Sequence, residues 1–130
     1  MFSFLSRFEP YLLSVLRAVT GLLFVQHGFT KLLGWPRTPM SDVAMSSLPG
    51  IAGLFEFAGG LLLIAGLFTR PTAFVLSGMM AVAYFTVHAP QGFFPIVNGG
   101  ELAATYCFVF LYFCVAGPGP WSLDAKRAGR

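Results

Sequence analysis

The stretch IAGLFEFAGGLLLIAGLF, residues 51–68, decides the fold class. It contains one charged residue, Glu56, and shows no strict alternation of apolar and polar residues. A helix needs about 17–25 mostly apolar residues to cross the ~30 Å hydrocarbon core of a bilayer. The stretch reaches the lower end of that range and is followed by the turn residues Thr69-Arg70-Pro71. It therefore predicts a membrane-spanning helix.

The rest of the chain contains three more apolar segments of this kind. We expect membrane spans at about residues 11–34, 51–68, 72–88 and 99–117, separated by stretches rich in Pro, Gly and Ser. The second and fourth are long enough only if flanking residues join them. The prediction is an all-α fold, an integral membrane four-helix bundle that occupies residues 1–130 as a single domain.

The overall composition favours the same class. Of 130 residues, 56% are hydrophobic and 10% are charged, whereas soluble domains carry about 25% charged residues. A soluble chain of this length could not bury so much apolar surface in one core. The net charge is +3, but the basic residues form no continuous stripe. We therefore expect the lipid bilayer as partner and no nucleic acid.

The basic residues also predict how the chain is oriented. Four crossings place both termini on one side of the membrane, together with the turn at Arg70. The opposite side has Arg37, with Lys31 just inside the end of the first span. Basic residues are more frequent on the side of the termini, at Arg7, Arg70, Lys126, Arg127 and Arg130. By the positive-inside rule, we expect a multi-pass protein of the bacterial cytoplasmic (inner) membrane with both termini in the cytoplasm.

Small and aromatic residues add detail to this arrangement. Glycine is frequent inside the first three spans, where small residues let membrane helices approach closely. Phe93, Phe94 and Trp35 suit the outer membrane interface, and Trp121 suits the inner one. We therefore expect close helix packing and aromatic residues near both membrane boundaries.

Six ionisable residues lie inside the predicted spans, where such groups are rare and usually face the protein interior. Arg17 alone falls in the inner half, where it could snorkel to the interface or pair inside the bundle. The other five share the outer half of the bundle: His27, Lys31, Glu56, His88 and Glu101. Because all four spans contribute to it, this group predicts a polar cluster that could bind a ligand.

The charges in this cluster allow two interpretations, which can coexist. Lys31 could form a mainly structural ion pair with Glu56 or with Glu101, or the pair could belong to a functional polar pocket. Haem ligation by His27 and His88 has no supporting pattern, so we expect no metal site. No catalytic motif is recognisable, so the catalytic residues stay unknown.

Glu101 also has a local interpretation at the start of the fourth span. Asn98 is a favoured N-cap residue, and a glutamate three positions later completes the spacing of a capping box. A carboxylate in the first turn also complements the positive end of a helix. We therefore expect Asn98 to cap the fourth helix, with Glu101 both in its first turn and at the depth of the polar cluster.

Taken together, these residues resemble the DoxX family of small four-helix bacterial membrane proteins. The matching pieces are RAVTGLLFVQHGFTKLLG from Arg17, GLFEFAGGLLLIAGLFTRPTA from Gly53, and NGGELAATY followed by GPGPWSLD up to Asp124. They span nearly the whole chain in family order. The positions that match the family pattern are Arg17, Gly28, Lys31, Glu56, Gly60, Arg70, Asn98, Gly100 and Glu101.

The resemblance implies a link to membrane redox assemblies. Family members include a thiosulfate:quinone oxidoreductase subunit, subunits reported with a terminal quinol oxidase, and part of an oxidoreductase complex that handles oxidative stress. The resemblance therefore implies a quinone as possible cofactor and oxidoreductase subunits as possible partners. A homo-oligomer is also possible, but the sequence does not determine the oligomeric state. We expect a redox-associated, quinone-linked membrane subunit. The alternative is a non-enzymatic membrane scaffold or partner-binding subunit, and whether the protein is an enzyme stays open.

Overall fold

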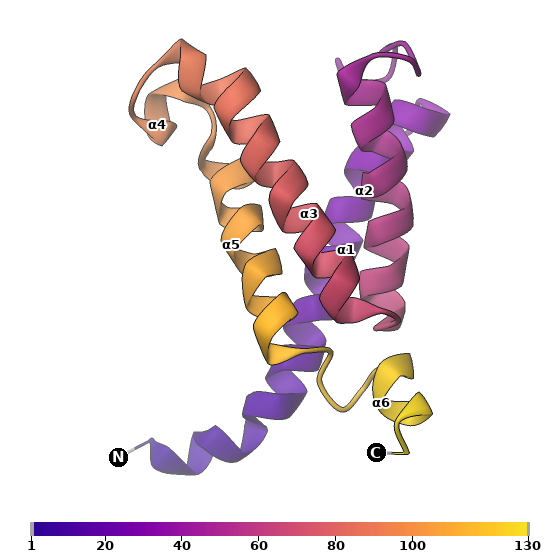
Figure 1. The fold of residues 1–130 in the computed structure, drawn as a ribbon, viewed down its shortest axis with the longest axis vertical. Coiled ribbons are helices and arrows are strands. Elements are labelled where there is room, and N and C mark those ends of the chain that lie inside the picture. The colour runs from indigo at the N-terminus through magenta and orange to yellow at the C-terminus, as the bar shows by residue number, and fades with distance from the viewer. Residues whose placement is uncertain (1, 130) are drawn as a thin grey trace. The chain divides into compact units, whose positions relative to one another are not determined.

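The computed structural model describes residues 2–129, and within that range it contains helices and no strands (Figure 1). The elements in chain order are η1 (Ser3–Phe8), α1 (Glu9–Leu33), α2 (Leu48–Ala65), α3 (Thr69–Ala83), η2 (Tyr84–His88), η3 (Ala89–Gln91), α4 (Pro95–Asn98), α5 (Glu101–Ala116) and α6 (Leu123–Arg127). Three continuous helical stretches, Ser3–Leu33, Leu48–Ala65 and Thr69–Gln91, are long and apolar enough to cross a membrane, and α5 is a shorter apolar helix. The all-α prediction is confirmed.

The described chain divides into two compact units, which are described separately because their relative placement is not determined. The first unit runs up to Thr69 and continues from Pro118 onward, so it contains α1, α2 and α6. The second unit is Arg70–Gly117 and contains most of α3 together with α4 and α5.

Helix α2 shows why the predicted boundaries shift by a few residues. Its N-cap is Ser47, whose hydroxyl oxygen accepts a hydrogen bond from the backbone N–H of Gly50 at 3.2 Å, and Pro49 occupies the first turn. The helix ends at Gly66, which has φ of 65° and therefore the left-handed conformation that suits glycine. Ser47 therefore sets the start of the helix and Gly66 its end, so that α2 is Leu48–Ala65 and not the predicted residues 51–68.

Close backbone contact between α1 and α2 organises the first unit. A Cβ atom placed on Gly28 would lie 2.5 Å from the backbone nitrogen of Phe57, and one on Gly60 would lie 2.7 Å from the Cβ of Val25. Both distances are too short for any side chain, so glycine is required at these crossing points. The predicted packing role of the span glycines is therefore confirmed at these two positions.

In the second unit, side-chain hydrogen bonds to the backbone connect α3 and α5. The Ser77 hydroxyl donates to the carbonyl oxygen of Cys107 at 2.8 Å. Near the other end of α5, Arg70 Nη1 donates to the carbonyl oxygens of Cys114, at 2.7 Å, and Val115. A cation is favourable there because the last carbonyl groups of a helix lack intrahelical partners and carry partial negative charge.

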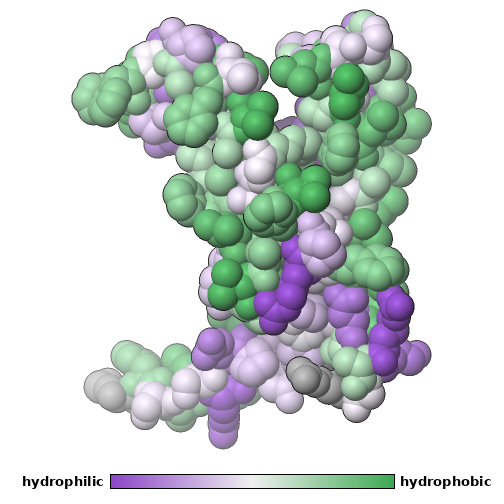
Figure 2. All heavy atoms as spheres, viewed as in Figure 1, coloured by the Kyte–Doolittle hydropathy of each residue, from purple (hydrophilic) through white to green (hydrophobic). Residues whose placement is uncertain are grey.

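The exposed helix surface is largely apolar, as expected for a protein that lipid surrounds. Leu22 and Leu23 of α1 are about half exposed, whereas Arg17, Thr20 and Glu56 are buried. Hydrophobic residues cover much of the visible face of α2, and hydrophilic residues gather around α6 (Figure 2). Several polar side chains are therefore buried while many apolar ones are exposed, which suits a bilayer as solvent.

Candidate polar site between the first two membrane helices

A buried ion pair joins the end of α1 to α2. Lys31 Nζ donates to Glu56 Oε1 at 2.7 Å. The side chains are only 10% and 5% exposed. Gly53 lies beside the aliphatic part of Lys31, where an added Cβ would come within 3.0 Å of the Lys31 Cβ. Of the two carboxylates that the sequence left open as partners of Lys31, the structure pairs it with Glu56.

The second carboxylate oxygen of Glu56 has no such partner. Glu56 Oε2 is buried and makes no hydrogen bond to any of residues 2–129. A buried polar atom without a partner costs about 1–3 kcal/mol, so proteins normally avoid it. The carboxylate therefore offers a buried hydrogen-bond acceptor next to a charged donor.

His27 belongs to the same part of the first unit. It is half-buried on α1, one helical turn before Lys31. It interacts electrostatically with both Glu56 and Lys31, and its ring centroid lies 6.2 Å from that of Phe24. The structure thus brings three predicted residues together. Among the described residues, no three His, Cys, Asp or Glu side chains are grouped so that they could hold a metal ion.

The two other predicted residues of the cluster, His88 and Glu101, lie in the second unit. His88 Nδ1 donates to the backbone carbonyl oxygen of Asn98 at 3.1 Å. Glu101 is exposed and is the first residue of α5. That these two residues share one site with Lys31 and Glu56 stays a prediction.

The predicted capping role of Asn98 is wrong. The N-cap residue of α5 is Gly100, which has no side chain to cap the helix. Asn98 is instead the last residue of α4, and it is buried. Its side-chain Oδ1 accepts a hydrogen bond from the N–H of Gly100 at 2.8 Å, and its Nδ2 donates one to the carbonyl oxygen of Gly92 at 2.9 Å. The reason is Gly99, whose φ of 70° ends α4 and adds a turn before α5. Glu101 does lie in the first turn of α5, as expected.

Arg17 is a buried anchor between three parts of the first unit, with only 1% of its surface exposed. The interpretation in which its side chain snorkels to the interface is therefore wrong. Its Nε donates to the carbonyl oxygen of Pro118 at 2.8 Å, and its Nη2 donates to that of Trp121 at 2.6 Å. Its Nη1 donates to the carbonyl oxygens of Leu63 and Ile64, near the end of α2. The partners are thus backbone carbonyl groups, which the sequence analysis did not anticipate.

Asp124 was also missed by the sequence analysis. Its carboxylate accepts hydrogen bonds from the backbone N–H groups of Phe68, at 2.9 Å, and Thr69, at 2.8 Å, and its own N–H donates to the carbonyl oxygen of Gly66 at 2.9 Å. Burial raises the pKa of Asp124, but the hydrogen bonds from Thr69 and Phe68 and the charge of Arg127 outweigh it and hold the pKa below its ordinary value. Asp124 thereby fixes the turn between α2 and α3.

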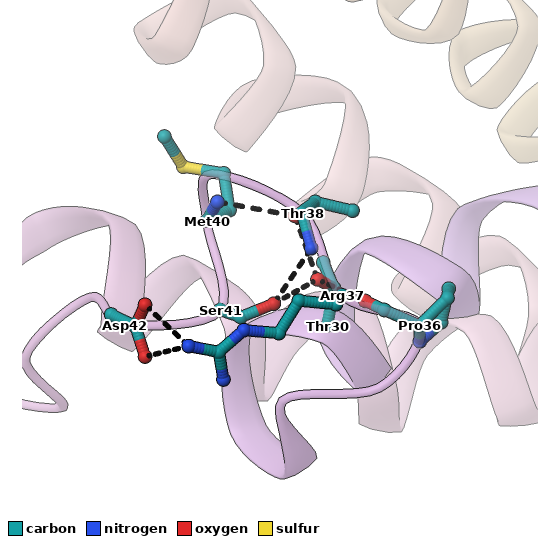
Figure 3. Close-up of polar contacts among 7 residues, drawn as sticks. All are labelled: Thr30, Pro36, Arg37, Thr38, Met40, Ser41 and Asp42. Carbon is teal, nitrogen blue, oxygen red and sulfur yellow. Dashed lines mark hydrogen bonds and ion pairs between the residues drawn. The ribbon is translucent and has the colours of Figure 1, made fainter.

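A network of hydroxyl groups fixes the chain just after the polar site (Figure 3). The buried Thr30 hydroxyl donates to the carbonyl oxygen of Pro36 at 2.8 Å, and its oxygen accepts from the hydroxyl groups of Thr38, at 2.7 Å, and Ser41, at 3.0 Å. Each of these hydroxyl groups has its own donor and acceptor, so the network has a structural role.

The same loop contains a second ion pair that contrasts with Lys31–Glu56. Arg37 Nη2 donates to Asp42 Oδ2 at 3.0 Å, and the two side chains are 73% and 74% exposed (Figure 3). Exposed pairs of this kind contribute about 0–1 kcal/mol to stability. This pair therefore provides a control for experiments on the buried one.

Apolar helices with charged groups buried between them define a multi-pass integral membrane protein. The sequence model of the DoxX family matches residues 12–89, which is more than half of the chain. The protein belongs to the DoxX family, as its residues predicted.

Two relatives agree with this assignment. The chain is 46% identical to an uncharacterized protein of Haemophilus influenzae, over 94% of this chain and 95% of the relative. It is 31% identical to the inner membrane protein YqjF of Escherichia coli, over 85% of this chain and 87% of the relative. No solved structure matches the chain. The protein is thus a multi-pass inner membrane protein, as predicted.

Proposed function

We propose that the protein is a redox-associated subunit of the inner membrane and that its Lys31–Glu56 pair binds the head group of a quinone. One observation carries the proposal, the buried Glu56 Oε2 that has no hydrogen-bond partner among residues 2–129 and lies next to a charged donor. The association with redox complexes comes from the resemblance to DoxX proteins. Oxidoreductase subunits are accordingly the proposed partners, with a second copy of the chain as a further one.

The hydrogen-bonding groups of the pair fit a quinone head group. The Lys31 ammonium has three N–H donors, one of which goes to Glu56 Oε1. Another would donate to a quinone carbonyl oxygen, while Glu56 Oε2 would accept a hydrogen bond from a quinol hydroxyl group. The bound quinone would supply the electron-carrying chemistry. The protein residues would orient the head group and hold a proton at Glu56 Oε2.

Quinone binding to the purified protein tests this function. We would titrate ubiquinone-1 into protein in lipid nanodiscs and follow its affinity for the wild type, Glu56→Gln and the control Arg37→Gln. Loss of a hydrogen bond to a charged group costs about 1.5–3 kcal/mol, so Glu56→Gln is expected to weaken binding about tenfold or more. Arg37→Gln should leave it unchanged. Failure of the wild type to bind, or equal binding by Glu56→Gln, would contradict the proposal.

A non-enzymatic scaffold is the second candidate function, and the direct contact between Lys31 and Glu56 favours it. Lys31 and Glu56 already join α1 to α2 at 2.7 Å without any ligand. On this alternative the pair only holds the helices together for a partner subunit to bind. Replacing both residues with apolar ones would then preserve partner binding, whereas a quinone site would be lost.

We also propose that α5 crosses the membrane, which gives a four-helix bundle with both termini in the cytoplasm. The apolar composition of α5 and the excess of basic residues near the termini support this topology. A green fluorescent protein fused to Arg130 should fluoresce because it folds in the cytoplasm, and an alkaline phosphatase fusion at the same point should be inactive. The reverse result would contradict the topology.

A further inference from the structure

The segment between α3 and α5 exposes large apolar side chains and has no charged residue. Its sequence is APQGFFPIVNGG, residues 89–100, called here the α4 segment. Phe93, Phe94, Ile96 and Val97 are 88%, 63%, 78% and 72% exposed. In water, such a cluster would be an unfavourable surface for a loop.

Several backbone polar groups of the α4 segment have hydrogen-bond partners within the segment or next to it. The buried Asn98 side chain donates to the carbonyl oxygen of Gly92 at 2.9 Å and accepts from the N–H of Gly100 at 2.8 Å. The backbone carbonyl of Asn98 accepts from His88, and the N–H groups of Val97 and Asn98 donate to the carbonyl oxygen of Phe94. A loop in contact with lipid must satisfy its backbone in this way, because no water is available to do so.

The loop between α1 and α2 differs from this segment in its charge. It exposes the charged side chains of Arg37 and Asp42, and the hydroxyl groups of Thr38 and Ser41 connect it to the buried Thr30 of α1 (Figure 3). The loop of residues 34–47 therefore combines exposed charges with exposed apolar side chains such as Trp35, whereas the α4 segment exposes large apolar side chains and has no charge.

The helical turns on either side of the α4 segment also expose large apolar side chains. Phe85, in the turn before it, is 70% exposed, and Leu102, in the first turn of α5, is 53% exposed. In Figure 1 the chain folds over after α3 so that α4 lies near the start of α5. With 16 residues, α5 rises about 24 Å, less than the ~30 Å hydrocarbon core. If the far end of α5 lies at one boundary, its first turn lies inside the other.

We propose that the α4 segment is inserted into the bilayer as a short re-entrant cap on α5. Phe93, Phe94, Ile96 and Val97 contact lipid, and Asn98 holds the segment's backbone together from within. The segment thereby completes the apolar length that α5 lacks. This inference is independent of quinone binding, because it concerns a different surface.

Site-directed spin labelling tests this proposal. Single cysteines at Ile96 and, as the control, Arg37 would be introduced into a Cys107→Ala, Cys114→Ala parent and labelled in proteoliposomes. Both positions are well exposed, with 78% of the Ile96 residue and 73% of the Arg37 side chain accessible. Oxygen, which concentrates in lipid, and a water-soluble nickel chelate would be equilibrated on both sides of the bilayer. The Ile96 label should respond more to oxygen, and the Arg37 label more to the chelate.

Two results would overturn the proposal. An Ile96 label as accessible to the chelate as the Arg37 label would mean an aqueous loop, and low accessibility to both reagents would mean that protein, such as a second copy, covers the surface. If the cysteine-free parent does not fold, Ile96→Trp in the otherwise native chain provides the test. Brominated lipids should quench the added tryptophan fluorescence, and absence of that quenching would also overturn the proposal.

Discussion

Helix α1 places two cations, Arg17 and Lys31, inside the protein. Their surroundings differ in whether the polar groups around the charge all have hydrogen-bond partners. Arg17 donates to four backbone carbonyl oxygens, and its partners come from α2 and from the segment before α6. Lys31 donates to one oxygen of Glu56, and the other oxygen has no partner among residues 2–129. A cation in which every nitrogen has a hydrogen-bond partner is explained by structure alone. An incomplete set of partners indicates a place where another molecule could bind.

The chemistry of the two side chains explains part of this difference. The arginine guanidinium group is planar and has five N–H donors in a fixed fork, so it can connect several carbonyl groups at once. The lysine ammonium group is a compact charge that pairs well with one carboxylate. Arg17 therefore anchors three chain segments, whereas Lys31 contributes to a local pair with spare hydrogen-bonding capacity.

The largest expected effect is that of Arg17→Met. The substitution leaves the carbonyl groups of Leu63, Ile64, Pro118 and Trp121 without their charged donor, and each such hydrogen bond contributes about 1.5–3 kcal/mol. We expect a loss of about 5 kcal/mol or more in the free energy of unfolding, measured in mixed SDS micelles. Arg17→Lys should recover only part of it, because one ammonium group cannot reach all four oxygens. A loss below about 1 kcal/mol would show that Arg17 is not an anchor.

An intermediate effect is expected when the Lys31–Glu56 pair is broken from one side. Lys31→Met and Glu56→Leu should each lower the free energy of unfolding by about 3 kcal/mol, because each leaves a buried charge without its partner. The double variant should recover to within about 1 kcal/mol of the wild type, since apolar residues often replace a buried pair without loss. The free energy of unfolding is again measured in mixed SDS micelles.

The exposed pair provides the control for that double-variant cycle. Arg37→Gln should change the free energy of unfolding by about 1 kcal/mol or less. If the losses in unfolding free energy from Lys31→Met and Glu56→Leu simply add in the double variant, the two residues are not energetically coupled. That result would contradict the description of Lys31 and Glu56 as a buried ion pair.

The smallest effect is expected for Asp124→Asn, and it depends on pH. Loss of the charged acceptor for the backbone N–H groups of Phe68 and Thr69 should lower the free energy of unfolding by about 1 kcal/mol at neutral pH. The pKa of Asp124 is lower in the folded protein than its ordinary value of 3.8. Its contribution is therefore present above pH 3.8 and is lost as the pH falls through the lower, folded-state pKa. The difference in melting temperature between the wild type and Asp124→Asn should shrink on acidification.

Asp42→Asn serves as the control for that pH dependence, because Asp42 is a carboxylate with a 74% exposed side chain. Its melting temperature should follow that of the wild type across the same pH range. A difference between wild type and Asp124→Asn that stays constant with pH would mean that the hydrogen bonds to the carboxylate contribute no charge-dependent stability.

The sequence by itself determined the class of the protein and its helices. Long apolar segments with few charges are stable in the bilayer, and a helix satisfies all of their backbone hydrogen bonds there. The fourth apolar segment accordingly forms a helix that begins at Glu101, and the all-α fold and the family assignment also followed from local patterns. The same patterns placed Lys31 and Glu56 at a similar depth.

The tertiary structure alone decided which groups meet. Arg17 binds Pro118, 101 residues further along the chain, and Asp124 binds the turn at Phe68 and Thr69. No local pattern predicts which distant backbone carbonyl or N–H group a side chain recognises, because every residue except proline carries both groups. The way in which α1 and α2 cross decides whether Lys31 pairs with Glu56. It also decides whether the second carboxylate oxygen of Glu56 has a partner. That crossing depends on long-range packing at Gly28 and Gly60, which becomes visible only in three dimensions.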